Sequence, residues 1–461
     1  MKRYRWLGLL MVLGLVAAAC GRSDDTTTNE EGGSTNTTAS SNAACDGVTL
    51  EATEIGVTED TITIQVMADT GSPLAPGLFQ GNVDAVKAFE KYINDNGGIG
   101  CRKLKVESWD SKLTPDESKN GQINACNTAL AMVGGNSLFN PDVTTMETCA
   151  DKAGQPVGIA DIAALANDVN EQCSKNTYII QGVAETCPED GGVPTGKRDL
   201  IAFVGNTKYY ESLASPLKGL FLVPGDLPTT VQSATYQIVG QREVGVDIIS
   251  GVKVSGRAEQ SAYTPIVQEL RNTGSNYVYN GSNDKTMIDM RSEAAAQGLN
   301  DIKIWACSLA CYTDKFKSAG SVVDGTYTWM QFLPFEDKGS NDELDAYLAS
   351  VETPDSFGAQ AWMAAVMFQD AIDDVVEAHG PNGITRANLL DALSKMTTFD
   401  AHGWMGAKNP KSGFSDCMVI VQAEGGEFKR AEPTEPGTFS CDPGNLVTVN
   451  VDPVVEAEKV R

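Results

Sequence analysis

Segments with a strand pattern alternate with segments with a helical pattern along most of this 461-residue chain. Residues 61–69, TITIQVMAD, are rich in β-branched side chains, and residues 82–94 then place apolar side chains at helical spacing. The alternation continues with a predicted strand at 103–109 and predicted helices at 115–128 and 141–153. Because this rhythm favours parallel sheets built from βαβ units, we predict an α/β fold.

The rhythm is interrupted at residues 167–200 and restarts with a predicted strand at 217–223. Since the chain is too long for one ordinary core, we expect two Rossmann-like lobes with a ligand cleft between them. The expected lobe I comprises residues 45–200 and 335–400, lobe II comprises residues 201–334 and 401–445, and residues 446–461 form a C-terminal tail. Parallel sheets bind ligands beyond the carboxyl ends of their strands, which selects the loops 70–76, 135–140 and 161–164.

Residues 1–19 have the pattern of a secretory signal peptide. A basic start precedes the apolar run 7–16, which is too short to span a membrane, and three alanines follow it. Cys20 comes next, in a context that resembles a lipobox, the site at which bacterial lipoproteins are lipidated and cleaved. The rest of residues 20–44 is polar and suits a flexible linker. We therefore expect the chain on the outer face of the cell membrane, held only by lipidated Cys20. Ordinary cleavage with a free Cys20 is the alternative.

Charge and cysteine content exclude several classes of function. The formal net charge of −26 argues against nucleic acid and anionic lipid headgroups as partners. Of the 11 cysteines, those other than Cys20 form an even set, which suggests disulfides in an exported protein. Only two histidines, His379 and His402, are present, so we expect no metal site and no cofactor. We find no H-E-x-x-H, G-x-S-x-G, P-loop or G-x-G-x-x-G motif and do not expect an enzyme.

Three segments in order carry a family resemblance: GVTEDTITIQVMADTGSPLAPG, AMVGGNSLFNPDV and FGAQAWMAAVMFQDAID. They resemble the type I periplasmic binding proteins, in particular the branched-chain amino acid and amide group that includes Leu/Ile/Val-binding proteins. The first is similar to that family's first strand and ligand loop, the second to its third strand and loop, and the third to the return to the first lobe. The resemblance runs from about residue 55 to about residue 430. It implies two lobes joined by a three-strand hinge that closes over a ligand.

The resemblance also implies a function. It indicates a monomeric substrate-binding lipoprotein of an ABC importer, which captures a small polar solute and presents it to permease subunits in the membrane. Amino acids, amides and small carboxylates are the expected solute classes. A ligand-sensing lipoprotein of the same fold, signalling to a partner protein, is the alternative. A structural lipoprotein that binds no solute is a further one.

Candidate ligand residues in lobe I follow from the family's loops. In the family, the loop after the third strand offers N–H and hydroxyl groups to an anionic ligand group, and here Asn136 and Ser137 occupy that loop. Ser72 in the first loop, and Asp161 and Ala163 in the fourth, are further candidates. An Asp is unusual beside an anionic ligand, because it would repel a carboxylate. Turn serines and helix capping are the structural alternatives.

Lobe II departs from the family's amino-acid binders. They place a Tyr after the lobe's first strand, where this chain has Asp226, and a carboxylate after a later strand, where this chain has Ser308. These departures weaken the case for a free α-amino acid. We take both residues as candidates, together with Tyr279 and Asn283, which core packing would explain equally well.

The disulfide pairing is not deducible from sequence alone. In the fold that the resemblance implies, Cys126 and Cys149 lie on the helices that flank the third strand, so we expect them to pair. The other expected pairs are Cys45–Cys101, Cys173–Cys187, Cys307–Cys311 and Cys417–Cys441. A metal or redox role is the alternative for Cys307 and Cys311.

Overall fold

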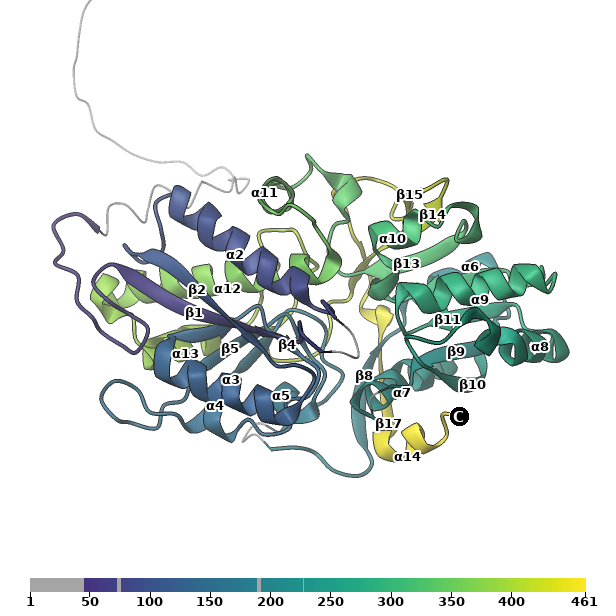
Figure 1. Cartoon of the computed structure of the whole chain (residues 1–461), viewed down its shortest axis with the longest axis horizontal. Helices are drawn as coiled ribbons and strands as arrows, with labels where there is room; N and C mark the ends of the chain where they lie inside the picture. Colours follow the sequence, from purple (N-terminus) through teal and green to yellow (C-terminus); the bar gives the residue numbers. More distant parts are fainter. Residues whose placement is uncertain (1–44, 73–75, 189–191, 227) are drawn as a thin grey trace, which may run out of the picture. The chain divides into compact units, whose positions relative to one another are not determined.

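The computed structural model describes residues 45–72, 76–188, 192–226 and 228–461 (Figure 1). The predicted signal peptide, Cys20 and the linker to residue 44 lie outside these residues. Within them the chain forms an α/β structure with two largely parallel sheets, as predicted.

The first sheet has the strand order β6-β4-β1-β3-β5-β7, with β2 paired to β1. Every pairing in it is parallel. Its strands are β1 (Thr61–Ala68), β2 (Lys103–Asp110), β3 (Ala131–Val133), β4 (Asn136–Ser137), β5 (Ala160–Ala163), β6 (Leu165–Ala166) and β7 (Thr177–Ile179). The associated helices are α2 (Gln80–Asp95), α3 (Pro115–Thr128), α4 (Thr144–Thr148), α5 (Val169–Gln172), α11 (Asp342–Ser350), α12 (Ser356–His379) and α13 (Arg386–Lys395).

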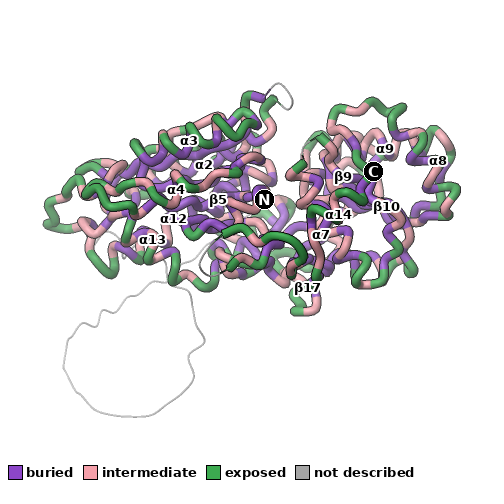
Figure 2. Tube along the Cα trace, turned by 90° about the horizontal axis from the view of Figure 1, so that it is seen from below, coloured by how far each residue is buried: buried purple, intermediate pink, exposed green. Residues whose placement is uncertain are grey.

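Side-chain alternation along β1 explains how this sheet is covered on both faces. Ile62 and Ile64 belong to one core with Phe89 of α2 and Trp362 of α12, whose rings meet edge to face at 5.0 Å. Met67 points the other way, into a second core with residues of α3 and α4. A strand buried on both faces reads as an almost continuous apolar run, as β1 does. In Figure 2 the buried residues accordingly follow the strands and the inner faces of the helices.

Two helix predictions in this region have different outcomes. The helix predicted at 115–128 is confirmed as α3, which begins with a Thr114 side chain that accepts a hydrogen bond from the Glu117 N–H. The helix predicted at 141–153 is wrong in length, because α4 covers only Thr144–Thr148. It ends where Cys149 adopts an extended backbone conformation.

The second sheet has the strand order β10-β9-β11-β12-β13-β14-β15, with β16 paired to β14. It is parallel up to β13 and antiparallel from β14 onward. Its strands are β9 (Lys218–Pro224), β10 (Asp247–Val254), β11 (Tyr277–Asn280), β12 (Ile304–Cys307), β13 (Thr326–Met330), β14 (Cys417–Glu424), β15 (Glu427–Glu432) and β16 (Ser440–Cys441). The helices are α6 (Gly205–Leu213), α7 (Pro228–Glu243), α8 (Thr264–Thr273), α9 (Asp284–Ala296) and α10 (Asp314–Lys317).

The chain passes between the two sheets three times: after β7, after β13 and before β14. The first passage contains β8 (Arg198–Phe203), which begins at the end of the segment 167–200 expected to be irregular. β8 pairs antiparallel with β17 (Leu446–Val451), and helix α14 (Pro453–Glu458) follows. Residues 446–461, expected as a tail, therefore supply a strand beside the first passage and a helix that contacts α7.

The structure joins the cysteines of its described residues in the five expected pairs. Three of these disulfides have a cysteine in a helix or strand: Cys126 lies in α3, Cys307 in β12 and Cys417 in β14. No helix in the described ranges has both the length and the apolar character needed to cross a membrane.

Two cationic side chains hold helices in place around the first sheet. Arg386 is fully buried and donates to the carbonyls of Cys126 and Ala129 at 2.8 and 2.7 Å, so it caps the C-terminal end of α3. His402 lies between two carboxylates, Asp370 of α12 at 3.1 Å and Glu343 of α11 at 3.0 Å. The hydrogen bond to Asp370, and then that to Glu343, raises the pKa of His402 to about 10.

Candidate functional site

A buried carboxylate organises the loops at the carboxyl end of the first sheet. Asp69 follows β1 and is fully buried. One of its oxygens accepts hydrogen bonds from the Ser111 hydroxyl at 2.6 Å and the Leu113 N–H at 2.7 Å, and the other accepts from the Leu138 N–H at 2.8 Å. Burial raises the pKa of Asp69, against these hydrogen bonds. The loops after β1, β2 and β4 are thus fixed to one side chain.

Asn136 and Ser137 form the short strand β4 at this edge, next to the end of β1. The Ser137 hydroxyl lies 2.7 Å from the Ser118 hydroxyl, inside the protein. The Asn136 side chain is 1 % exposed, and within the described residues neither its oxygen nor its nitrogen has a hydrogen-bond partner. Ser72 is also buried, at 2 % exposure. The structure therefore brings these three candidates to one edge, with Asn136 holding unused hydrogen-bonding capacity.

Asp161 and Ala163 are not in a loop, which corrects the prediction: both lie within β5. Asp161 is 1 % exposed and accepts a hydrogen bond from the Thr177 hydroxyl at 3.3 Å. Burial raises the pKa of Asp161 to about 7. Burial, and then the charge of Asp161, raise the pKa of Glu171 in α5 well above its usual value. The two carboxyl groups form a buried acidic pair.

The lobe II candidates divide into two sets. Asp226 accepts a hydrogen bond from the Gly256 N–H at 2.7 Å, and the Asn283 amide donates to the Gly256 carbonyl at 3.1 Å, so both meet at one turn. Tyr279 is a core residue: it stacks on Phe221 at 4.6 Å and is 1 % exposed. Ser308, by contrast, is half-buried directly after β12.

A polar pocket with a volume of about 210 Å³ lies between α7, which follows β9 of the second sheet, and the segment 167–172, which follows β6 of the first. The Thr229 hydroxyl, in the first turn of α7, is 3.5 Å from the Leu138 carbonyl and bridges the two lobes next to it. Ala184, Glu185, Leu200 and Pro453 close the pocket on the side of the first passage. Its other lining residues are mostly polar: Asn167, Asp168, Val169, Asn170, Gln172, Thr229, Gln232, Ser233 and Tyr236.

The charges beside this pocket are acidic. Glu185 is 9 % exposed and is bound by both the Nε and an Nη of Arg198, at 2.7 and 2.6 Å. Asp168 is 6 % exposed and accepts hydrogen bonds at one oxygen from the backbone and side-chain nitrogens of Asn170, at 3.0 and 2.8 Å. Across the described part of the chain, no basic group lies within 4.0 Å of the Asp168 carboxylate.

The predicted ligand residues do not line this pocket, and sequence reasoning missed the residues that do. The segment 167–172 lies in the stretch 167–200 that was expected to be irregular. One sequence signal was present: Asp168 followed by Asn170 and Glu171 is the pattern of a helix N-cap with acidic residues in the first turn, and Asp168 caps α5. That signal predicts where a helix begins, but it does not indicate that α7 of the other lobe lies across the pocket from this helix.

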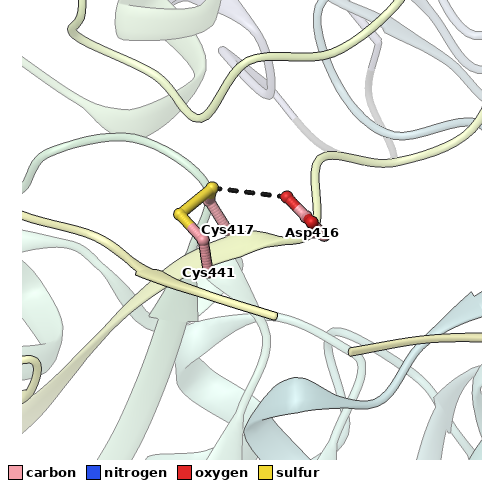
Figure 3. Close-up of side chains that lie close together, drawn as sticks. All are labelled: Asp416, Cys417 and Cys441. Atoms are coloured by element: carbon pink, nitrogen blue, oxygen red, sulfur yellow. Dashed lines mark hydrogen bonds between the residues drawn. A yellow bond between two sulfur atoms is a disulfide. The ribbon is translucent and has the colours of Figure 1, made fainter. Parts of the chain in front are cut away.

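One cluster has the residue types of a metal site without its chemistry. Asp416, Cys417 and Cys441 lie close together, with the Asp416 carboxylate 3.4 Å from Cys417 Sγ (Figure 3). Because Cys417 and Cys441 form a disulfide, neither sulfur is available as a thiolate ligand. The cluster therefore gives no reason to revise the expectation that the chain has no metal site.

Residues 222–427 match the family model described as periplasmic binding protein. Among solved structures, an ABC transporter substrate binding protein from Aeropyrum pernix superimposes with a TM-score of 0.64 at 12% identity, over 86% of this chain and 99% of that one. A leucine binding protein from Thermotoga maritima gives 0.60 at 11% identity, over 83% and 99%. A fatty acid ABC transporter substrate-binding protein from Thermomonospora curvata gives 0.56 at 15% identity, over 90% and 98%.

The chain has the type I periplasmic binding protein fold. The resemblance expected from the sequence motifs is thereby confirmed, together with the two-lobed α/β architecture. No curated protein sequence matches the chain. The polar pocket lies between the two lobes of this fold, beside the hydrogen bond from Thr229 to Leu138.

Proposed function

We propose that this chain is an extracytoplasmic solute-binding lipoprotein of an ABC importer, and that the polar pocket between α7 and residues 167–172 holds its solute. The observation that carries the proposal is a pocket of about 210 Å³ contributed by both lobes. Pockets between domains are the usual place for a small ligand, because hinge closure surrounds it and excludes water.

The similar structures favour binding over catalysis, since they are substrate-binding proteins by name. One of them is named for leucine and another for fatty acid, so the shared fold does not define the solute. Most of the residues that line the pocket have polar side chains, which favours a small solute with polar groups over an acyl chain.

A thermal-shift screen of the purified full-length protein in mild detergent, with its disulfides intact, tests the proposal. The panel contains amides, ureas, amines, guanidines, amino acids and short carboxylates. A solute present at about 100 times its Kd stabilises the folded state by about 2.7 kcal/mol, which is readily detected. If no solute class stabilises a protein shown to be folded by circular dichroism, the solute-binding proposal is wrong.

A matched pair of variants tests whether the pocket is the binding site. Ser233→Trp fills the pocket from α7, whereas Ser394→Trp places the same side chain on α13. Each of the two hydroxyls donates to the carbonyl three residues earlier in its helix, at 3.0 and 2.7 Å, and Ser394 is exposed where Ser233 is half-buried. We expect Ser233→Trp to abolish binding of any solute found in the screen and Ser394→Trp to leave it unchanged. Equal affinity in both variants would place the solute elsewhere.

The lipid anchor is tested separately. We expect Cys20→Ser to move the protein from the membrane fraction to the soluble fraction of cells, without changing solute affinity. Mass spectrometry of the wild-type N-terminal peptide should show a diacylglyceryl group on Cys20. An unmodified Cys20 in membrane-associated protein would refute lipid anchoring.

A further inference from the structure

We propose that the polar pocket selects a small solute that carries N–H donors and no carboxylate, such as a primary amide, a guanidine or an amine. This inference rests on the proposed solute-binding function and names the class of solute. It follows from counting which hydrogen-bonding groups around the pocket are already used.

The hydroxyl groups of α7 present oxygen lone pairs to the pocket. The Thr229 hydroxyl directs its proton at the Leu138 carbonyl, and the Ser233 hydroxyl donates to the Thr230 carbonyl at 3.0 Å. Because a hydroxyl has one proton to donate and two lone pairs, both groups remain able to accept.

The opposite wall also presents acceptors. Gln172 donates through its amide nitrogen to the Ala166 carbonyl at 3.0 Å, and its side-chain oxygen is buried and does not face the pocket. Asp168 receives both of its hydrogen bonds at one oxygen, and its second oxygen accepts none from any described group. Tyr236 is the exception, because its hydroxyl accepts from the Gln237 amide at 3.4 Å and keeps a proton to donate. The Thr229, Ser233 and Asp168 oxygens call for donors on the ligand.

The positive charge next to the pocket is already neutralised by an ion pair. Arg198 contacts the pocket-lining residue Glu185, and its Nε and one Nη are bound to that carboxylate in a two-pronged ion pair. A carboxylate in the pocket would lose its hydration beside Asp168, and the described lining residues include no Lys or Arg to compensate. An N–H donor or an ammonium would satisfy Asp168 instead. Asn167 and Gln232, whose amides both donate and accept, can meet a carbonyl oxygen of an amide solute.

The test is isothermal titration calorimetry on the full-length protein with ligands that share one carbon skeleton of three to six carbons and differ only in the terminal group. Amide, guanidinium, ammonium and carboxylate forms are compared, first on wild type and then on Asp168→Asn. The substitution removes the charge but keeps a side chain that caps α5, because Asn is as good an N-cap as Asp. Asp442→Asn is the matched control, since Asp442 caps a short helix away from the pocket through the Gly444 N–H at 2.6 Å.

We expect the donor-bearing ligands to bind, the carboxylates not to bind, and Asp168→Asn to weaken the best ligand at least about tenfold while Asp442→Asn has no effect. A carboxylate as the best ligand, or an affinity unchanged by Asp168→Asn, would overturn the inference while leaving the solute-binding function intact. Failure of every ligand class to bind folded protein would overturn both.

Discussion

Replacing Asp69 with alanine should destabilise the first lobe strongly, although the change removes no apolar contact. The Asp69 carboxylate accepts hydrogen bonds from the N–H groups of Leu113 and Leu138 and from the Ser111 hydroxyl, all inside the protein. Each buried donor left without an acceptor costs about 1–3 kcal/mol. Burial of the carboxyl group, which raises its pKa, offsets part of this loss. The expected net decrease in the free energy of unfolding is about 2–4 kcal/mol.

Urea denaturation monitored by circular dichroism measures the effect, with the disulfides kept oxidised and the earliest transition analysed if the lobes unfold separately. Asp151→Ala is the control, because Asp151 accepts a single loop hydrogen bond, from the Gln155 N–H at 2.8 Å, and should cost less than about 1 kcal/mol. Asp69→Asn should fall between the two, since its amide keeps one acceptor oxygen but turns an NH₂ group toward Leu138. If Asp69→Ala and Asp151→Ala lose the same stability, Asp69 does not hold the three loops together.

Three other effects should be measurable on the same protein. The pKa of His402 is raised to about 10, so the stability that protonated His402 contributes is complete below about pH 6.5 and is lost as the pH rises through 10. The difference in Tm between wild type and His402→Gln should therefore shrink over that range. His379→Gln is the control. A difference that stays constant from pH 6 to pH 10 would contradict the assignment. Arg386→Met should lower the free energy of unfolding by about 3–5 kcal/mol in urea denaturation, because the substitution leaves the carbonyls at the end of α3 without a hydrogen-bond donor. A loss below about 1 kcal/mol would show that water replaces the guanidinium. Replacing Cys126 and Cys149 together by serine should cost about 2–4 kcal/mol in the same assay, and an unchanged denaturation midpoint would mean that the bridge does not constrain the unfolded chain.

Most of the fold could be predicted because its strands and helices have strong local patterns. The apolar run of β1 and the helical spacing of α2 are visible in the sequence, and Thr114 with Pro115 marks the start of α3. Residues 198–203 and 446–451 were missed as strands, because they pair with each other at a sequence separation of about 251 residues and neither has neighbours that reveal the pairing. A two-stranded contact of this kind is specified by tertiary structure.

The candidate site was harder to predict, for a physical reason that the residues make clear. The rule that ligands bind beyond strand ends identified Asn136 and Ser137, and the structure does place them at the edge of the first sheet. It also identified Asp161, whose place inside β5 could not be seen because strand ends are the least certain part of such a pattern. The pocket residues come from the segment 167–172, from the first passage, from α7 and from Pro453, which are far apart in the sequence and meet only in the folded chain.

The predicted loop and the observed pocket are nevertheless connected through the backbone. Asp69 fixes the Leu138 N–H, and the carbonyl of the same residue receives the Thr229 hydroxyl from α7. Thr229 then lines the pocket with its remaining lone pairs. The loop after β4 therefore supports the position of α7 beside the proposed pocket, and the direct ligand contact that the family resemblance implied for this loop stays a prediction. Since this support ends in the Thr229–Leu138 hydrogen bond, which joins the two lobes beside the pocket, we expect closure of the lobes and formation of the pocket to occur together.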